Sequence, residues 1–128
     1  MSTASSKTVV RRYLEALSAG DKSPEVVRKY VSDEALIQHI ATIEAGFPRY
    51  ELSAEDMIAE DDRVVLRATF RGTHQGEFAG IAPTGRQVTQ PFIIIYRVDG
   101  EKIVEHWIGI DMMSLMQQLG AVPEGATH

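Results

Sequence analysis

Residues 87–110 read QVTQPFIIIYRVDGEKIVEHWIGI, with two apolar segments on either side of Asp99-Gly100. An Asp-Gly pair between such segments is a strong local signal for a two-residue hairpin turn. Both flanks are rich in β-branched and aromatic residues, which favour strands. The stretch therefore predicts a long antiparallel hairpin with strands over 87–98 and 101–110.

A two-residue turn also predicts which residues share a face, because paired residues project to the same side of a sheet. It pairs Tyr96 with Ile103 and Phe92 with Trp107. One side then carries Gln90, Phe92, Tyr96, Glu105, Trp107 and Asp111. The other carries Ile93, Ile95, Val104, His106, Ile108 and Ile110. We interpret the first side as a cavity wall, because ligand cavities combine apolar walls with a few polar groups, and the second as a packing face. A one-residue slip would exchange the two faces.

The strand pattern continues upstream of the hairpin. Residues 63–73 alternate with a period of two, and residues 50–60 read as a further strand that ends at Asp61-Asp62. Residues 72–85 contain four glycines and read as a loop or bent arm. The three regions indicate a run of antiparallel strands.

Helices are expected before and after these strands. Apolar residues recur at helical spacing over 9–17, with Ser5 or Ser6 as a cap and Gly20 after the end. Ser23-Pro24 begins a second, short helix. Asp111 is expected to cap a last helix over 112–119.

The segment between the second helix and the first strand is less clear. Residues 35–40 read as a short strand or extended segment, and residues 41–50 could hold a turn of helix. The whole order predicts an α+β fold, with helices on one face of a curved antiparallel sheet and a pocket in the mouth of the resulting cone.

The composition limits the class of protein. The chain has 128 residues, which fits one domain, and we expect loose ends at 1–4 and 121–128. The absence of cysteine excludes a disulfide scaffold, a Cys-ligated metal and a thiol nucleophile. The net charge of −5 argues against a nucleic-acid partner.

Hydropathy gives expectations about location. The longest apolar run, PFIIIY over 91–96, is far below the roughly 20 residues that a spanning helix needs. The first residues, MSTASSKTVVRRYLEAL, lack the apolar region of a signal peptide. We therefore expect a cytoplasmic protein that does not bind membranes.

Two segments resemble a known family. GTHQGEFAGIAPTGRQV over 72–88 resembles the signature loop and strand of the SnoaL-like polyketide cyclases, or ester cyclases, of the NTF2-like superfamily. YRVDGEKIVEHWIGIDMMSLMQQLG over 96–120 resembles their closing hairpin and last helix. The helical N-terminus and His39 also fit, so the resemblance covers nearly the whole chain.

The resemblance implies a strongly bent antiparallel sheet wrapped around helices, with an internal cavity, commonly in a homodimer. It also implies an enzyme that closes a ring by intramolecular aldol attack with an acid/base carboxylate and no metal or cofactor. In the family that carboxylate is expected on the last strand, near its tryptophan. Here the residue after Trp107 is Ile108, and the available acids are Glu105 and Asp111.

Each ionisable candidate has two interpretations. Asp111 is a general acid/base or the cap of the last helix, and these compete because backbone N–H donors lower a carboxyl pKa. Glu105 is a buried acid if it faces the cavity and a solvated residue otherwise. His106 is a base or orienting partner, or a structural histidine. His39 reaches into the mouth of the cone or lies in a loop, and His74 belongs to a turn or rim. No His-x-His or His-Glu-x-x-His spacing occurs, so we expect no metal.

Three functions remain open from the sequence. The first is a cofactor-independent cyclase acting on a small hydrophobic carbonyl compound. In it Asp111, Glu105, His106 or His39 carries the acid/base chemistry, and Phe92 and Trp107 form walls. Gln90, Tyr96 and His39 would hold oxygens. The second is a homodimeric binding module without catalysis, and the third is a hydrolase or isomerase that uses the same pocket. A cavity carboxyl with a raised pKa would favour an enzyme, whereas only solvated or ion-paired acids would favour binding.

Overall fold

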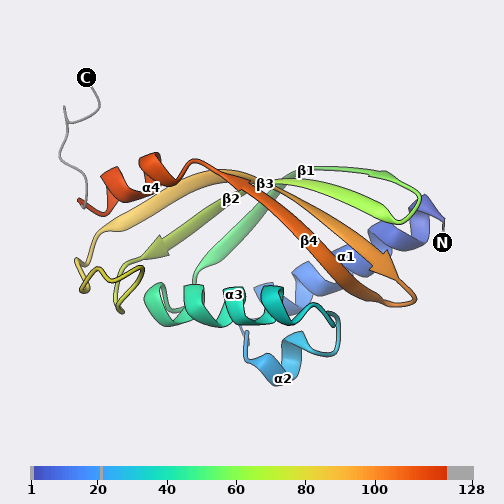
Figure 1. The fold of residues 1–128 in the computed structure, drawn as a ribbon, viewed down its shortest axis with the longest axis horizontal. Coiled ribbons are helices and arrows are strands. Elements are labelled where there is room, and N and C mark those ends of the chain that lie inside the picture. Colours follow the sequence, from blue (N-terminus) through green and yellow to red (C-terminus); the bar gives the residue numbers. More distant parts are fainter. Residues whose placement is uncertain (1, 21, 121–128) are drawn as a thin grey trace.

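The computed structural model describes residues 2–20 and 22–120. Three helices come first along this part of the chain, four strands follow, and a last helix comes after the strands (Figure 1). The elements are α1 (Thr3–Ser18), α2 (Pro24–Val27), α3 (Glu34–Gly46), β1 (Glu51–Glu60), β2 (Arg63–Thr73), β3 (Gln87–Asp99), β4 (Lys102–Ile110) and α4 (Met112–Gln118).

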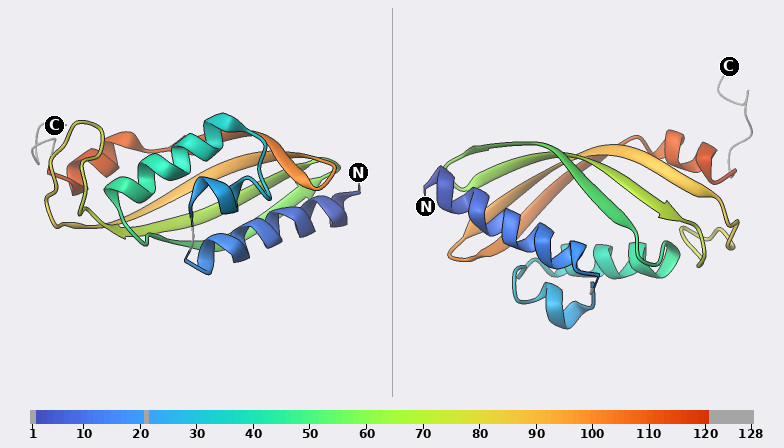
Figure 2. Two further views of the ribbon diagram at one scale, coloured as in Figure 1. Left: turned by 90° about the horizontal axis from the view of Figure 1, so that it is seen from below. Right: turned by 180° about the vertical axis from the view of Figure 1, so that it is seen from behind.

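The strands form one antiparallel sheet in the order β1-β2-β3-β4. The sheet is long and curved, and α1, α2 and α3 all lie on the same side of it, while α4 follows β4 at one end (Figures 1 and 2). The predicted α+β fold, with helices on one face of a curved sheet, is confirmed.

The core lies between these helices and the sheet. Val10, Tyr13 and Leu17 of α1 are buried against it, and along β2 the inward Leu66 is fully buried while Arg67 is exposed. Fully burying one such aliphatic or aromatic side chain stabilises the fold by about 1.5–3 kcal/mol. The period-two alternation that predicted β2 is therefore the alternation between core and solvent.

The expectation of an extended segment over 35–40 is wrong, because these residues belong to α3. Leu36, Ile37 and Ile40 are buried at helical spacing, and the Asp33 carboxylate accepts a hydrogen bond from the Leu36 N–H at 3.3 Å. Asp33 is therefore the N-cap residue at which α3 begins.

The predicted hairpin register is wrong as well, and two features cause the error. Asp99 pairs with Lys102, so the turn is centred one residue further along and shifts the pairing by two residues. A β-bulge at Val104 then adds one more, because Arg97 pairs with Glu105 while Val98 pairs with Ile103. A shift by two keeps the faces, but the single bulge residue exchanges them.

Beyond the bulge, the face assignments of β4 are therefore reversed. Tyr96 pairs with His106, which faces inward, and Ile108 and Ile110 also turn toward the helices. Glu105 and Trp107 lie on the outer face. Gln90, Phe92 and Tyr96 of β3 are buried on the inner face, as expected.

The start of α1 differs in its cap from the expectation. The Ser2 side chain, rather than Ser5 or Ser6, caps α1 by accepting from the Ser5 N–H at 3.1 Å. The expected loose residues 121–128 lie outside the described part. None of the helices within 2–20 and 22–120 has the length and apolar character needed to cross a membrane.

Candidate active site

A cavity of about 260 Å³ lies between α3 and the inner face of the sheet. Most of its wall is aliphatic or aromatic. The polar groups on the wall are the His39 ring, the Gln90 amide and the hydroxyls of Tyr13, Tyr50 and Tyr96. Of the described residues that line it, none is Asp, Glu, Lys or Arg. The carboxyl expected in this cavity is therefore not among its lining residues.

The backbone brings an aspartate to the inward histidine of β4. The segment before α3 runs parallel to β4, where Val31 bridges Ile103 and the Ser32 N–H donates to the Ile103 carbonyl at 2.9 Å. This pairing places Asp33 beside His106. The Asp33 Oδ2 atom lies 2.6 Å from His106 Nδ1, and both side chains are largely buried, with exposures of 13% and 14%.

This contact fixes the state of the His106 ring. A carboxylate can only accept, so Nδ1 carries the proton and donates it to Asp33. The other carboxylate oxygen of Asp33 caps α3 through the Leu36 N–H. Asp33 therefore joins the first turn of α3 to the middle of β4, and it orients His106 as an aspartate orients a catalytic histidine in other enzymes.

His39 lies on α3 between this pair and the cavity. Its ring is stacked with that of His106, with centroids 6.4 Å apart and planes 30° from parallel. Within residues 2–20 and 22–120, the His39 ring forms no hydrogen bond. Burial lowers the pKa of His39, and the charge of His106 lowers it further. His39 is therefore neutral at neutral pH and has a ring nitrogen free to accept a proton.

Two tyrosines face the same cavity with the opposite property. The rings of Tyr13 and Tyr96 meet edge to face at 5.7 Å, and their hydroxyls are hydrogen-bonded. Burial is the main cause that raises both pKa values well above the usual range, so both phenols stay protonated. The pair holds two hydroxyl protons and uses one in its mutual hydrogen bond, which leaves one to donate to a ligand oxygen.

Gln90 closes the other end of the cavity, near α4. Its Oε1 accepts from Gln118 Nε2 at 3.0 Å, and its Nε2 donates to the Pro91 carbonyl at 3.2 Å. Gln118 Oε1 in turn accepts from the Thr89 N–H at 2.9 Å. This amide chain ties α4 to β3 and leaves Gln90 one N–H.

Five of the residues that the sequence singled out lie in or beside the cavity. His39, His106 and Tyr96 lie at one end of the cavity region, and Gln90 lines the other end. Phe92 forms part of the wall between them, as expected.

The other candidates lie outside the cavity. Glu105 is ion-paired with Arg97 on the outer face of the sheet, where Trp107 is 42% exposed under the Arg63 guanidinium. Asp111 caps α4, with its Oδ1 accepting from the Ser114 N–H at 3.0 Å, and borders a shallow depression on the outer side of the sheet. These placements follow from the Val104 bulge and from the cap.

The remaining residues are His74, which the sequence singled out, and Asp33, which it did not. His74 is fully buried, and its Nδ1 accepts from the Thr84 N–H at 3.2 Å, so it organises the 74–86 arm from within. The sequence reasoning missed Asp33. Aspartate is a common helix cap, which is the local signal at this position, but nothing in the sequence indicates a partner 73 residues away.

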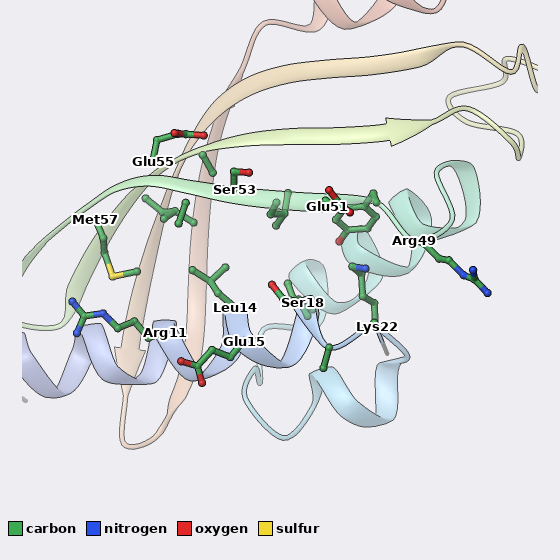
Figure 3. A pocket seen from close by; sticks show the side chains of 18 of the residues that line it. Arg11, Leu14, Glu15, Ser18, Lys22, Arg49, Glu51, Ser53, Glu55 and Met57 are labelled. Carbon is green, nitrogen blue, oxygen red and sulfur yellow. The ribbon is translucent and has the colours of Figure 1, made fainter.

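A second and larger hollow lies between α1 and β1 (Figure 3). It encloses about 1180 Å³ and has a charged lining that includes Arg11, Glu15, Lys22, Arg49 and Glu51. Lys22 lies 4.6 Å from the centroid of the Tyr50 ring and 3.8 Å from the Glu44 carboxylate. Tyr50 and Leu52 line both hollows and so form the wall between them.

The sequence model for SnoaL-like polyketide cyclases matches residues 7–119. This chain belongs to the SnoaL-like polyketide cyclase family. The SnoaL-like match spans all eight helices and strands except the first turn of α1. It confirms the resemblance that residues 72–88 and 96–120 indicated.

Solved structures agree with this assignment. AclR, a candidate hydroxylase from Streptomyces galilaeus, is 31% identical, with a TM-score of 0.81 over 95% of this chain and 85% of AclR. A candidate SnoaL-like polyketide cyclase from Jannaschia sp. CCS1 is 25% identical, with a TM-score of 0.82 over 94% and 95%. TsrD from Streptomyces laurentii is 25% identical, with a TM-score of 0.80 over 94% and 98%. Comparison with curated proteins gave no match.

Among the described residues, no three His, Asp or Glu side chains converge as ligands for a metal ion. The Asp33–His106–His39 cluster contains groups that can accept and donate protons.

Proposed function

We propose that this SnoaL-like protein is an enzyme that moves a proton at a carbon next to a carbonyl group, and so closes a ring by intramolecular aldol attack. The observation that carries the proposal is His39. It is a cavity-lining histidine whose pKa is lowered and whose ring nitrogens are not engaged by the described residues. Membership of the cyclase family supports the same reaction class.

The cavity residues described above each carry one part of the reaction. His39 removes a proton from the carbon beside the carbonyl, and the electron pair of that C–H bond moves through the enolate to the carbonyl oxygen. The free hydroxyl of the Tyr13–Tyr96 pair donates a hydrogen bond to that oxygen as it becomes negative and keeps its own proton, so the first carbonyl re-forms when the enolate carbon attacks. The enolate carbon then bonds to a second carbonyl carbon of the same molecule, whose oxygen takes the proton from His39. No atom is gained or lost.

His106 and Asp33 act through His39. When His39 is protonated, the centroid of its ring lies 6.4 Å from that of His106, and the Asp33 carboxylate is hydrogen-bonded to the edge of the His106 ring at Nδ1. The carboxylate offsets the positive charge that the histidine pair gains in the transition state. Asp33 and His106 are therefore positioning residues, and their loss should change the pH dependence of the rate as well as its size.

The test uses 2-tetralone, a neutral ketone with acidic C–H bonds next to its carbonyl. In D₂O the enzyme should exchange these hydrogens for deuterium faster than buffer does, as followed by NMR. His39→Asn should slow the exchange roughly 10²–10⁴-fold, which is the usual contribution of a general base. The matched control is Asp111→Asn, because asparagine caps a helix about as well as aspartate.

The two variants separate the structural proposal from the alternative that the sequence raised. Loss of exchange in His39→Asn with full activity in Asp111→Asn supports His39 as the base. Loss in Asp111→Asn with full activity in His39→Asn would overturn the assignment and return the role to Asp111.

A binding module without catalysis is the second candidate. The observation that favours it is the lack of a carboxylate among the described lining residues, which removes the usual acid/base group of the family from the cavity. Measurable binding of 2-tetralone with an exchange rate equal to that of buffer would support this candidate over the enzyme.

We further propose that the protein is a homodimer through the outer face of its sheet. That face exposes Ile58, Ile93 and Trp107 by 62%, 48% and 42%. The half-buried Val65 and Ile95 lie between Ile58 and Trp107 in one row across the four strands. Four arginines and three acids surround the apolar centre: Arg63, Arg67, Arg71, Arg97, Asp56, Glu60 and Glu105. An apolar patch rimmed by charges of both signs is typical of a protein interface.

A further inference from the structure

We propose, on the basis of the function above, that the substrate is an uncharged, oxygen-poor carbonyl compound no larger than about two fused rings. Size, charge and the number of polar groups in the cavity each limit the ligand, and each limit is independent of the others.

The first limit is volume. An apolar cavity of about 150 Å³ in an engineered protein holds one benzene molecule. By the same ratio, the present cavity of about 260 Å³ holds roughly ten non-hydrogen atoms, the size of two fused rings. The wall cannot expand far, because Phe92 and Tyr96 are packed in the core and Tyr50 separates the cavity from the second hollow between α1 and β1. A ligand of three or four fused rings is larger than the volume of this cavity.

The second limit is charge. None of the described lining residues is ionic at neutral pH, since His39 is neutral and the tyrosines are protonated. Lys22 lies in the second hollow, on the other side of the wall that Tyr50 and Leu52 form (Figure 3). Its ammonium is 3.8 Å from the Glu44 carboxylate and 4.6 Å from the centroid of the Tyr50 ring. A carboxylate or phosphate in the cavity would lose its water without gaining an opposite charge, which strongly disfavours binding.

The third limit is the number of hydrogen bonds on offer. The Tyr13–Tyr96 pair has one free proton and Gln90 has one free N–H, at opposite ends of the cavity. The Tyr50 hydroxyl and the His39 ring are the remaining polar groups among the described lining residues. Each further hydroxyl on a ligand would be buried against apolar wall without a partner, which costs binding free energy. The cavity therefore selects molecules with few oxygens.

Isothermal titration calorimetry with isosteric ligand pairs tests the proposal. Acetophenone and benzoate have the same number of non-hydrogen atoms and differ in charge, and so do 4-phenylbutan-2-one and 3-phenylpropanoate, which are close to the upper limit of size. Both ketones should bind, each at least tenfold tighter than its carboxylate partner. 1-Acetylpyrene, which carries the same acetyl group on four fused rings, should show no binding.

A variant pair locates the binding. Ile108 lines the cavity and is partly exposed, so Ile108→Phe narrows the space and should weaken the binding of 4-phenylbutan-2-one at least tenfold while acetophenone still binds. Ile58→Phe makes the same kind of enlargement on the outer face and should change neither affinity. If Ile108→Phe does not fold, Ile43→Phe on α3 makes the corresponding change from the opposite wall.

The outcomes separate this inference from the proposed reaction. Ketone binding with no deuterium exchange would refute the reaction and leave the substrate class standing. Equal binding of ketones and carboxylates, tight binding of 1-acetylpyrene, or no binding of either small ketone would overturn the substrate class, whatever the exchange assay shows.

Discussion

Replacing Asp33 tests the link between α3 and β4 on which the candidate site rests. Asp33→Ala removes two interactions, the cap of α3 and the hydrogen bond from His106 Nδ1. The cap is worth about 1 kcal/mol and a largely buried hydrogen bond to a charged group about 2 kcal/mol. We expect the free energy of unfolding to fall by about 3 kcal/mol in this variant.

Asp33→Asn separates the two contributions. Asparagine caps helices about as well as aspartate, so only the charge that faces His106 is lost, and the free energy of unfolding should fall by about 1 kcal/mol. Urea unfolding followed by circular dichroism measures both values. A double-mutant cycle between Asp33→Asn and His106→Ala then isolates the pair, and we expect a coupling energy of about 1 kcal/mol.

Two results would refute this reasoning. If Asp33→Ala unfolds within about 0.5 kcal/mol of the unmodified protein, a typical size for a surface substitution, Asp33 does not join the two elements. If the two substitutions in the cycle are additive, the contact between Asp33 and His106 contributes nothing, and the positioning role of Asp33 fails with it.

Other predictions concern pH and assembly. The lowered pKa of His39 means that the neutral base is fully present above about pH 6.5, so the exchange rate of 2-tetralone should be level there and fall only at lower pH. A rate that keeps rising well above that pH would contradict a His39 base. Below about pH 6.5 the unfolded chain binds more protons at this residue than the folded chain, so its contribution makes stability decline as the pH falls, and His39→Asn should reduce that decline in urea titrations. Trp107→Glu places a charge in the exposed apolar centre of the sheet and should weaken the dimer about tenfold or more in sedimentation velocity, with ligand binding retained; an unchanged sedimentation profile would exclude this face as the interface.

Much of the fold could be predicted because its signals are local. The apolar spacing over 9–17 and the Ser23-Pro24 pair predict α1 and α2, and the period-two alternation of 63–73 predicts β2. Each pattern spans only a few residues and reflects one buried face. The error over 35–40 has the same origin, because a short apolar run fits a buried helix as well as a strand.

The candidate site was predicted in part. His39, Gln90, Phe92 and Tyr96 come from segments whose faces follow from local alternation, and all four line the cavity. Glu105 and Trp107 were placed on the wrong face by a register that assumed an unbroken ladder. A bulge depends on how two strands pack and twist together, so the residues of one strand do not predict it.

The sequence by itself determined the family and every element except α3, because apolar periodicity, turn residues and caps act over a few positions. Only the tertiary structure decided which side of β4 faces the cavity and which acid meets which histidine. The Val104 bulge turns His106 inward and Glu105 outward, and the bridge from Val31 to Ile103 brings Asp33 to His106 across 73 residues. Both depend on contacts between distant segments, whose geometry is fixed when the chain packs.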